Sequence, residues 1–483
     1  MNAKEILKKI FKYDSFRDGQ EHIINSILNG QDVLSIMPTG GGKSICYQIP
    51  SLMLDGITYV ISPLISLMQD QVNALKDLKI QASCINSTIT KSEINKIYQS
   101  IREGLTKIVY VAPERLENQD FICFSKNINI SMIAIDEAHC ISRWGQDFRP
   151  SYLNILGFIN TLSKRPIISC FTATATEEVK SDIIAILKLD NPEIIITGYD
   201  RKNLYYKVEH IGKKVKKIEY IVDFLKSHPN DSGIIYCLTR TDVDELMNTL
   251  NKKDFSITKY HAGMENSVRK QNQEKFTNDE NRIIVATSAF GMGIDKPNVR
   301  FVIHYNIPKT IEDYYQESGR AGRDGKPAIC ILFYSSSDSY KNQYLISKNQ
   351  NFPDITYKDL TRLQKMEHYG EIKGCLRNYI LEYFGEKKTI PCNNCGNCDQ
   401  TYIKIDKTED AKLVIKCVEE INNSYGISTI ISILRGSQTS KIKKNNLHCC
   451  KCFGALKSLT DNDIRMVIDQ LLEDNYLLKV NKV

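Results

Sequence analysis

The chain has 483 residues, of which 42% are hydrophobic and 25% are charged. This balance is ordinary for a globular protein and excludes a chain that is disordered throughout, while the length is enough for about three domains. The formal net charge of +7 favours a polyanionic partner.

The first stretch, residues 1–16, places apolar residues at helical spacing among lysines. It has no apolar run long enough for a signal-peptide core, and no part of the chain approaches the ~20 apolar residues of a membrane span. We therefore expect a cytoplasmic protein, associated with the nucleoid if the cell is prokaryotic, and no membrane partner. Eight cysteines stand singly in apolar surroundings and are expected to be buried, reduced thiols: Cys46, Cys84, Cys123, Cys140, Cys170, Cys237, Cys330 and Cys417.

Between residues 30 and 340, short β-rich apolar runs alternate with longer helix-like stretches. The runs are DVLSIM, ITYVIS, KIVYVA, SMIAID, PIISCFTA, SGIIYCL, RIIVAT, RFVIHY and AICILFY. Such runs between helices are typical of parallel strands that are covered on both faces. A lysine-rich segment, HIGKKVKKIEY, separates the fifth run from the sixth, so we predict two α/β domains in tandem with a boundary near residue 205. One large sheet is the alternative, and the usual size of sheets disfavours it.

The strand pattern stops after residue 340. Helical stretches follow, then a cluster of cysteines at residues 375–398, then a final segment with helix-like periodicity. The clearest helix in that segment is predicted at residues 463–474, where Ile464, Val467, Ile468, Leu471 and Leu472 share one face.

The segment DVLSIMPTGGGKSICYQI has the pattern of a strand, a glycine-rich turn and a helix. Glycines let the backbone wrap phosphates, Lys43 would reach the outer phosphates, and Ser44 would ligate Mg²⁺. The strict phosphate-loop pattern fails at its first position, where Met37 stands, and an ordinary turn is the alternative. The contacts predicted for the nucleotide are Thr39, Gly40, Gly41, Gly42, Lys43 and Ser44.

Charged residues elsewhere could complete a hydrolytic site. In SMIAIDEAH, Asp136 would hold Mg²⁺ through water and Glu137 would deprotonate the attacking water, although an isolated Asp-Glu pair is usually solvated surface. QESGRAGRDG offers Arg320 and Arg323 in a glycine-flanked turn of the second α/β domain, as expected of an arginine finger. A basic or salt-bridged surface loop is the alternative.

The late cysteines have the spacing of a metal site. Cys375 precedes a C-x-x-C-x-x-C run of Cys392, Cys395 and Cys398. Four thiolates around tetrahedral Zn²⁺ at ~2.3 Å fit this spacing, and a closed set of four ligands is structural, with an iron-sulfur cluster as the alternative. A second site in HCCKC, residues 448–452, is not expected, because adjacent cysteines cannot easily both reach one tetrahedral metal.

The motifs PTGGGKS, DEAH, FTATAT, ATSAFGMGIDKPNVRFVIHYNIP and YYQESGRAGRDG resemble those of superfamily 2 helicases, and their wording is similar to that of RecQ DNA helicases in particular. The resemblance covers residues 5 to 480. It implies two tandem RecA-like parallel-sheet domains, at residues 1–205 and 206–340, then a helical zinc-binding subdomain at 341–405 and a shortened winged-helix domain at 406–483.

The same resemblance implies an ATP-dependent 3′ to 5′ DNA helicase that unwinds duplex or branched DNA in recombination and repair. ATP, Mg²⁺ and Zn²⁺ would be its cofactors. Its partners would be single-stranded DNA, duplex junctions, and single-strand-binding or repair proteins, and it is expected to act as a monomer. An RNA-dependent ATPase of the same superfamily and a DNA-binding or annealing module are the alternatives.

The resemblance also implies roles at the nucleotide. In YDSFRDGQ, Tyr13 would stack on adenine while Arg17 and Gln20 would bond to the nucleotide, and Asp18 stands where the family commonly has proline. Without the resemblance, Tyr13 would be read as a half-buried core aromatic. Asp295 would lie near the nucleotide. Four residues would couple the nucleotide site to DNA or to domain movement: His139, Thr172, Thr174 and Gln316.

The segment CISRWGQDFRPSY is similar to the aromatic-rich loop of RecQ proteins, and it holds the only tryptophan of the chain. Trp144 and Phe148 would stack on bases of single-stranded DNA at ~1 to 3 kcal/mol per base, and Arg149 would sense both DNA and the acidic pair. A tryptophan that plugs a core gap is the alternative. Gln146 stands where the family usually has histidine, which puts the strength of coupling in doubt.

The final segment resembles a winged-helix domain. Its sequence LRGSQTSKIKKNN would supply four phosphate contacts to duplex DNA, namely Arg435, Lys441, Lys443 and Lys444. A charge run of this kind is as readily a solvated face. The sequence given ends at LLKVNKV, about where the first strand of the wing is expected, so a weaker or altered grip on duplex DNA is expected.

Overall fold

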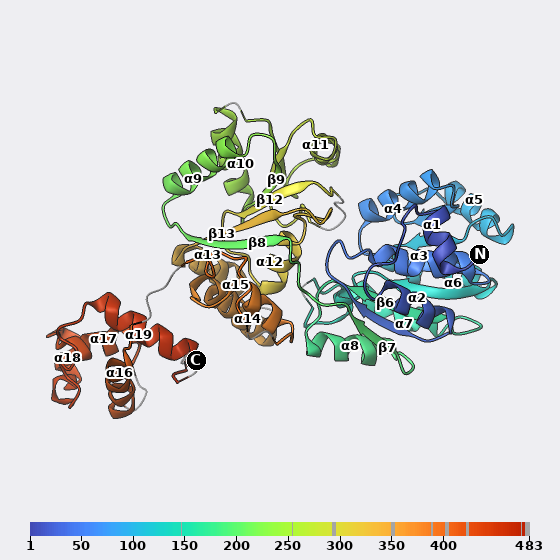
Figure 1. Cartoon of the computed structure of the whole chain (residues 1–483). Coiled ribbons are helices and arrows are strands. Elements are labelled where there is room, and N and C mark those ends of the chain that lie inside the picture. The colour runs from blue at the N-terminus through green and yellow to red at the C-terminus, as the bar shows by residue number, and fades with distance from the viewer. Residues whose placement is uncertain are drawn as a thin grey trace. The chain divides into compact units, whose positions relative to one another are not determined.

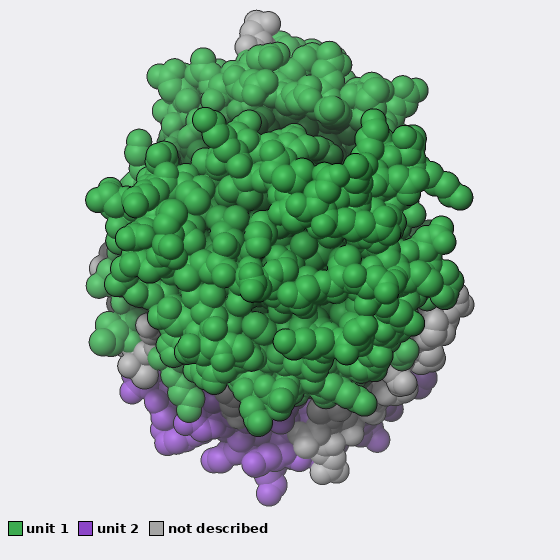
Figure 2. Space-filling model, turned by 90° about the vertical axis from the view of Figure 1, so that its right-hand side faces the viewer, with its two compact units in different colours: residues 1–399 green, residues 400–483 purple. Residues whose placement is uncertain are grey.

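The computed structural model describes residues 1–145, 147–253, 255–291, 296–348, 353–387, 390–400, 405–421, 425–474 and 476–478. The chain forms two compact units, residues 1–399 and residues 400–483, which are coloured separately in Figure 2. No helix in the described ranges is long and apolar enough to cross a membrane.

The first sheet of the larger unit has the strand order β3-β4-β2-β5-β6-β1-β7, and each pair of neighbouring strands is parallel (Figure 1). Its strands are β1 (Val33–Ile36), β2 (Ile57–Ile61), β3 (Ala82–Ile85), β4 (Ile108–Val111), β5 (Ile130–Ile135), β6 (Ile167–Thr172) and β7 (Glu193–Ile196). The phosphate loop follows β1, the acidic pair follows β5, and FTATAT overlaps the end of β6. Because β5, β6 and β1 are parallel neighbours, these three motifs meet at the carboxyl ends of these strands.

Helices cover this sheet and supply its core. They are α1 (Ala3–Lys9), α2 (Gln20–Leu28), α3 (Lys43–Met53), α4 (Ile65–Asp77), α5 (Lys91–Arg102), α6 (Gln119–Lys126), α7 (Asn154–Ile159) and α8 (Glu177–Leu187), with the short 3₁₀ helices η1 (Pro113–Glu117), η2 (Ala138–Ile141) and η3 (Pro150–Leu153). Strands β1, β2 and β4 are buried along their whole length, as their continuous apolar sequences require.

The second sheet is also parallel, with the order β10-β11-β9-β12-β13-β8. Its strands are β8 (Leu204–His210), β9 (Ser232–Tyr236), β10 (Ile257–Tyr260), β11 (Ile283–Ala286), β12 (Val299–His304) and β13 (Ala328–Tyr334), with helices α9 (Lys214–Ser227), α10 (Arg240–Asn251), α11 (Asn266–Thr277) and α12 (Ile311–Ser318). The prediction of two tandem α/β sheets is confirmed, and each of the nine predicted apolar runs contains a strand.

Three helices and a cysteine loop complete the larger unit. They are α13 (Ser336–Ser347), α14 (Pro353–Glu371) and α15 (Leu376–Tyr383), which lie next to β8 and β13 in Figure 1. The cysteine loop pairs with the edge strand β8 of the second sheet. Cys395 forms an isolated parallel β-bridge with Tyr206, and the Gly396 N–H donates to the Tyr206 carbonyl at 2.8 Å. This loop is therefore built onto the second α/β domain.

The smaller unit is helical in its described residues. It contains α16 (Thr408–Glu420), α17 (Ile427–Arg435), α18 (Ser440–Lys444), η4 (Leu447–Cys449) and α19 (Asp461–Glu473) around one apolar core. Helix α19 confirms the helix predicted near residue 463, and Thr460 and Asp463 form a capping box that fixes its start.

One expectation about the isolated cysteines is wrong. Cys123 is exposed, whereas the other seven are buried as expected. Helix α6 turns Phe121 and Phe124 toward the core, so the position of Cys123 between them falls on the solvent side.

Candidate active site

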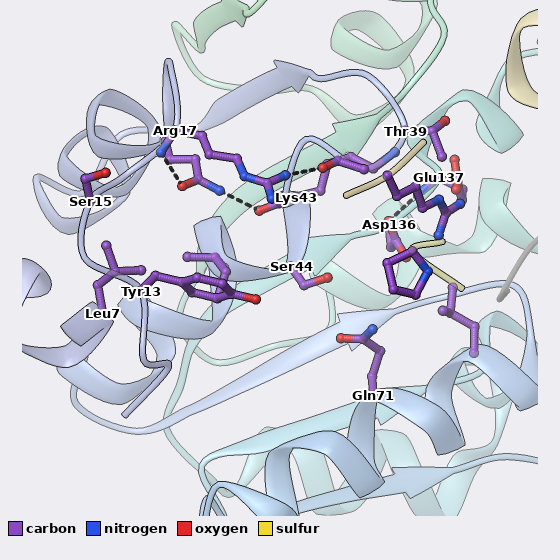
Figure 3. A pocket seen from close by; sticks show the side chains of 17 residues that line it. Leu7, Tyr13, Ser15, Arg17, Thr39, Lys43, Ser44, Gln71, Asp136 and Glu137 are labelled. Carbon is purple, nitrogen blue, oxygen red and sulfur yellow. Dashed lines mark hydrogen bonds between the residues drawn. The ribbon is translucent and has the colours of Figure 1, made fainter. Parts of the chain in front are cut away.

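A cavity of about 510 Å³ lies where β1 and β5 end (Figure 3). Tyr13 stands at one end of the view, Asp136 and Glu137 at the other, with Lys43 and Ser44 between them. The lining residues are Leu7, Tyr13, Ser15, Arg17, Gln20, Thr39, Gly40, Gly42, Lys43, Ser44, Ile45, Leu67, Gln71, Asp136, Glu137, Pro297 and Arg323. The aromatic ring at one end and the cations Lys43 and Arg323 among the lining residues suit a nucleotide.

The phosphate loop has the backbone that its glycines allow. Gly40 and Gly42 have φ of 81° and 84°, in the left-handed region. Gly42 also lacks room for a side chain, since a Cβ there would lie 2.5 Å from Nε2 of Gln20. Helix α3 starts at Lys43 with no side-chain cap among the described residues, so its first amides suit phosphate oxygens. The cradle therefore fits ATP.

Residues predicted to bond to the nucleotide also hold this loop. The Gln20 side chain donates to the carbonyls of Gly42 at 3.0 Å and Gly41 at 3.3 Å, and it accepts from the Arg17 N–H at 2.8 Å. The Arg17 guanidinium donates to the Gly40 carbonyl. Tyr13 is 53% exposed at the rim, which argues against the core alternative and leaves its ring open to a base.

The acidic pair lies at the end of β5, where both residues are partly buried and the Glu137 side chain is 12% exposed. Glu137 has φ of 48°, a strained value for a residue with a side chain, and its N–H donates to Oδ1 of Asp136 at 3.0 Å. Burial and the neighbouring Glu137 raise the pKa of Asp136. Burial acts in the same direction on Glu137, but Lys43, His139 and the two motif arginines outweigh it and lower its pKa. Glu137 is therefore the more acidic carboxylate of the pair.

Ser44 and Asp136 both line the cavity, so a hydroxyl and a carboxylate oxygen face the same space. Hard oxygen donors of this kind are those that Mg²⁺ takes beside phosphates. The donor set fits the metal that the fold implies.

Both predicted arginines of the second α/β domain reach the site. Arg323 lines the cavity, and a Cβ on Gly40 would lie 3.2 Å from its Cγ. Arg320 is 3% exposed, and with Arg323 it lowers the pKa of Glu137. The two domains thus bring cations to one partly buried carboxylate.

Arg201 was missed by the sequence analysis. Its guanidinium donates to four backbone carbonyls, those of Thr39 at 2.6 Å, Gly319 at 3.1 Å, Ala321 at 2.9 Å and Gly322 at 2.9 Å. One side chain therefore ties the phosphate loop to the arginine turn. It follows β7 and belongs to no motif, so nothing near it in the sequence signals this position.

The residues predicted to couple the site to DNA form a short chain of contacts. Nδ1 of His139 lies 2.8 Å from the Thr172 hydroxyl and 3.4 Å from Oε2 of Glu137. The Thr172 hydroxyl in turn donates to the Thr174 carbonyl at 3.0 Å. Burial lowers the pKa of His139, which favours the neutral ring. Gln316 is also buried, in α12.

The aromatic loop begins at Cys140, the residue after His139, and it contains Trp144, Phe148 and Arg149. Trp144 is half-buried, and Phe148 lies under the Arg143 guanidinium at 5.9 Å. Arg149 pairs with Asp147 at 2.8 Å and donates to the Pro63 carbonyl at 2.8 Å. Gln146 and Asp295, on which two further predictions fall, lie outside the described residues.

The four predicted cysteines meet at one point. The Sγ atoms of Cys375, Cys392, Cys395 and Cys398 all lie within 4.8 Å of one another, and those of Cys392 and Cys398 are 3.9 Å apart. Tetrahedral Zn²⁺ with bonds of about 2.3 Å requires sulfurs about 3.8 Å apart. The donor set therefore fits zinc, and no fifth position is offered for chemistry.

The predicted duplex contacts of the smaller unit lie in different surroundings. Arg435 pairs with Asp461 at 3.0 Å and also donates to the Leu459 carbonyl, so its charge already serves the fold. Lys441 donates to the Thr429 hydroxyl at 3.0 Å. Lys443 and Lys444 are exposed.

Four family models match the chain in succession. They are the DEAD/DEAH box helicase at residues 17–182, the helicase conserved C-terminal domain at 216–325, the RecQ zinc-binding domain at 336–399 and the RQC domain at 401–483. Together with the two sheets and the shared cavity, they define a motor ATPase of the helicase class.

Individual relatives narrow the class. The chain is 42% identical over 476 residues to the ATP-dependent DNA helicase RecQ of Bacillus subtilis, covering 98% of this chain and 80% of that protein. It is 39% identical to a putative ATP-dependent RNA helicase of Acanthamoeba polyphaga mimivirus, covering 99% and 88%. The solved structure of S. cerevisiae Dbp5 with RNA shares the fold, with a TM-score of 0.57, 16% identity and coverage of 74% and 97%.

The chain belongs to the RecQ family of ATP-dependent DNA helicases. As a member of that family it is an ATP-dependent DNA helicase that uses ATP, Mg²⁺ and Zn²⁺.

Proposed function

We propose that the chain couples single-stranded DNA at Trp144 to ATP hydrolysis at Glu137, and that it moves 3′ to 5′ to unwind duplex or branched DNA in recombination and repair. The observation that carries the proposal is the continuity of the contacts. His139 touches Glu137 and Thr172, and it stands at the base of the loop that presents Trp144. A base stacked on Trp144 would thus act on the Glu137 carboxylate through His139 and the four residues that lie between His139 and Trp144.

Each side of the cavity has a proposed task. ATP would place its base against Tyr13 and its phosphates along Gly40, Gly41 and Lys43. Bound Mg²⁺, held by Ser44 and Asp136, would neutralise phosphate charge. Glu137, kept ionised by the surrounding cations, would take a proton from the attacking water.

The arginine turn would report the nucleotide to the second domain. We assign the finger to Arg323, because it lines the cavity and packs against Gly40, and give Arg320 the role of a second cation that holds Glu137 ionised. Thr172, Thr174 and Gln316 would pass the change to domain movement. Closure on ATP and opening after hydrolysis would alternate the grip on the strand.

The remaining contacts belong to the same proposal. Phe148 and Arg149 would extend the single-strand site, and Lys441, Lys443 and Lys444 would meet duplex phosphates, with Arg435 as a weaker candidate because of its internal ion pair. The protein would act as a monomer in the cytoplasm, on the nucleoid, with single-strand-binding or repair proteins as partners.

The decisive test compares ATP hydrolysis by the wild type and Trp144→Ala, with single-stranded DNA, single-stranded RNA or no nucleic acid. Stimulation by DNA that disappears in the variant is the expected result. Equal stimulation by RNA would favour an RNA-dependent ATPase, and stimulation that survives in Trp144→Ala would refute the coupling.

A second variant addresses the annealing alternative. Glu137→Gln keeps the shape of the side chain but removes the base. The proposal requires that the variant bind ATP and DNA yet lose hydrolysis and unwinding, whereas an annealing module would keep its activity.

A further inference from the structure

Helix α14 covers the tip of the aromatic loop. The ammonium of Lys358 lies over the Trp144 ring, and the guanidinium of Arg362, one turn further along α14, donates to the Trp144 carbonyl. Both the face of the ring and the backbone beside it are therefore occupied by one helix, which lies more than two hundred residues away in the sequence.

The occupied face is the one that a base needs. An ammonium over an indole ring is held by the negative potential of the π-face, and a nucleotide base stacks on that same face. Lys358 and a base on this face therefore compete for Trp144. The competitor is itself a cation, so once displaced it stands close to the phosphate that arrives with the base.

The second contact keeps the cover in place. The Arg362 side chain is only 18% exposed, and it also pairs with Asp359 on the same helix, at 3.8 Å. The guanidinium is therefore held between its own helix and the loop. Lys358 alone can leave the ring without loss of the backbone contact, which makes it the movable part of the cover.

We propose that Lys358 is a positioning residue that holds Trp144 in a resting arrangement, and that single-stranded DNA starts the ATPase by replacing the Lys358 ammonium with a base. Arg362 is the fixed anchor of this cover. The inference rests on the proposed coupling of Trp144 to Glu137, and it adds the element that keeps turnover low in the absence of DNA.

The chain offers a direct probe, because Trp144 is its only tryptophan. Intrinsic fluorescence and its quenching by acrylamide therefore report the cover on Trp144 alone. The test variant is Lys358→Ala in the full chain. The matched control is Lys365→Ala, on the same helix, whose ammonium lies 5.1 Å from the Tyr383 ring instead.

Three readouts are taken: quenching without DNA, ATP turnover without DNA, and the oligothymidylate concentration that gives half of maximal stimulation. For Lys358→Ala we expect stronger quenching, DNA-free turnover raised about two- to fivefold, and a half-stimulating concentration lowered by a similar factor. Lys365→Ala should match the wild type in all three.

Two results would overturn the inference. Unchanged quenching means that Lys358 does not cover the ring in solution. Stronger quenching with unchanged DNA-free turnover, or with a raised half-stimulating concentration, means that Lys358 is an ordinary phosphate contact. Failure of the underlying coupling is separable, since DNA stimulation would then survive in Trp144→Ala whatever the quenching of Lys358→Ala shows.

Discussion

Gly145, next to the tryptophan, gives the sharpest prediction about coupling. A Cβ at this position would lie 2.1 Å from the carbonyl oxygen of His139 and 3.0 Å from that of Ser142. Carbon and carbonyl oxygen normally approach no closer than about 3.3 Å, so Gly145→Ala must push the loop away from His139 by about 1 Å.

The magnitude follows from the place of the strain. His139 carries the contacts to Glu137 and Thr172, and a misplacement of about 1 Å near reacting groups costs about 10²-fold in rate. We expect DNA-stimulated ATP turnover of Gly145→Ala to fall by about that factor. The cost in unfolding free energy should be about 1–3 kcal/mol, as for other overpacked sites.

The control is Gly157→Ala. Gly157 lies in α7, and a Cβ there meets nothing within 4 Å, so the change should be neutral or stabilise by about 0.5–1 kcal/mol. ATP turnover is measured with and without single-stranded DNA, alongside urea unfolding. The reasoning fails if the DNA-stimulated turnover of Gly145→Ala stays within about twofold of the control, a difference far below the loss expected from the displacement.

Three other changes test separate parts of the site. Arg201→Lys should lower the free energy of unfolding in urea by about 3 kcal/mol and raise the KM for ATP, because one ammonium cannot donate to all four carbonyls. An unchanged KM would contradict the link to the phosphate loop. Cys395→Ser should lower the zinc content measured by atomic absorption below that of the wild type, and equal zinc would refute the four-sulfur site. Burial lowers the pKa of His139, so the folded state binds fewer protons there than the unfolded state, and the free energy of unfolding falls as the pH drops below about 6.5. His139→Gln should show a smaller fall. An identical dependence of stability on pH in the variant and the wild type would contradict the buried neutral ring.

The sequence predicted the interior of both sheets and missed their margins. The nine recognised runs are central strands or buried along most of their length, whereas the four missed strands are β3, β7, β8 and β10. All four are edge strands of the two sheets. An edge strand contacts only one neighbouring strand and tolerates polar residues, so it lacks the continuous apolar run of a central strand. In β7, for example, exposed and half-buried residues alternate.

The site was predicted where its residues share a motif. The phosphate loop, the acidic pair and the four cysteines each carry their chemistry within a short stretch, and the strand order β5-β6-β1 brings the first two together. Arg201 contacts the Thr39 carbonyl 162 residues away, and Arg362 contacts the Trp144 carbonyl 218 residues away. Contacts of that kind depend on tertiary packing, and no local pattern announces them.

The hydrogen bonds that hold the aromatic loop explain why a base stacked on Trp144 should affect His139. The two ends are closed by the Arg149 N–H, which donates to the Cys140 carbonyl at 2.9 Å. The base of the loop is held by the Ser142 hydroxyl, which donates to Asp182 of α8 at 2.6 Å and accepts from the Trp144 N–H at 3.0 Å. These hydrogen bonds fix both ends of the loop, so a displacement of Trp144 is not absorbed by movement of the neighbouring backbone.

Two routes remain for a displacement of the tryptophan. One runs through Gly145, whose N–H donates to the Ser142 carbonyl at 2.9 Å and whose Cα leaves no space beside the His139 carbonyl. The other runs through α14, where Lys358 and Arg362 meet the ring and its carbonyl. The first route leads to His139 and hence to Glu137, and the second opposes movement until DNA arrives. A loop that is closed at its ends, tight at Gly145 and covered at its tip has two alternative positions. Gly145→Ala should therefore lower ATP turnover in the presence of DNA, whereas Lys358→Ala should raise ATP turnover in its absence.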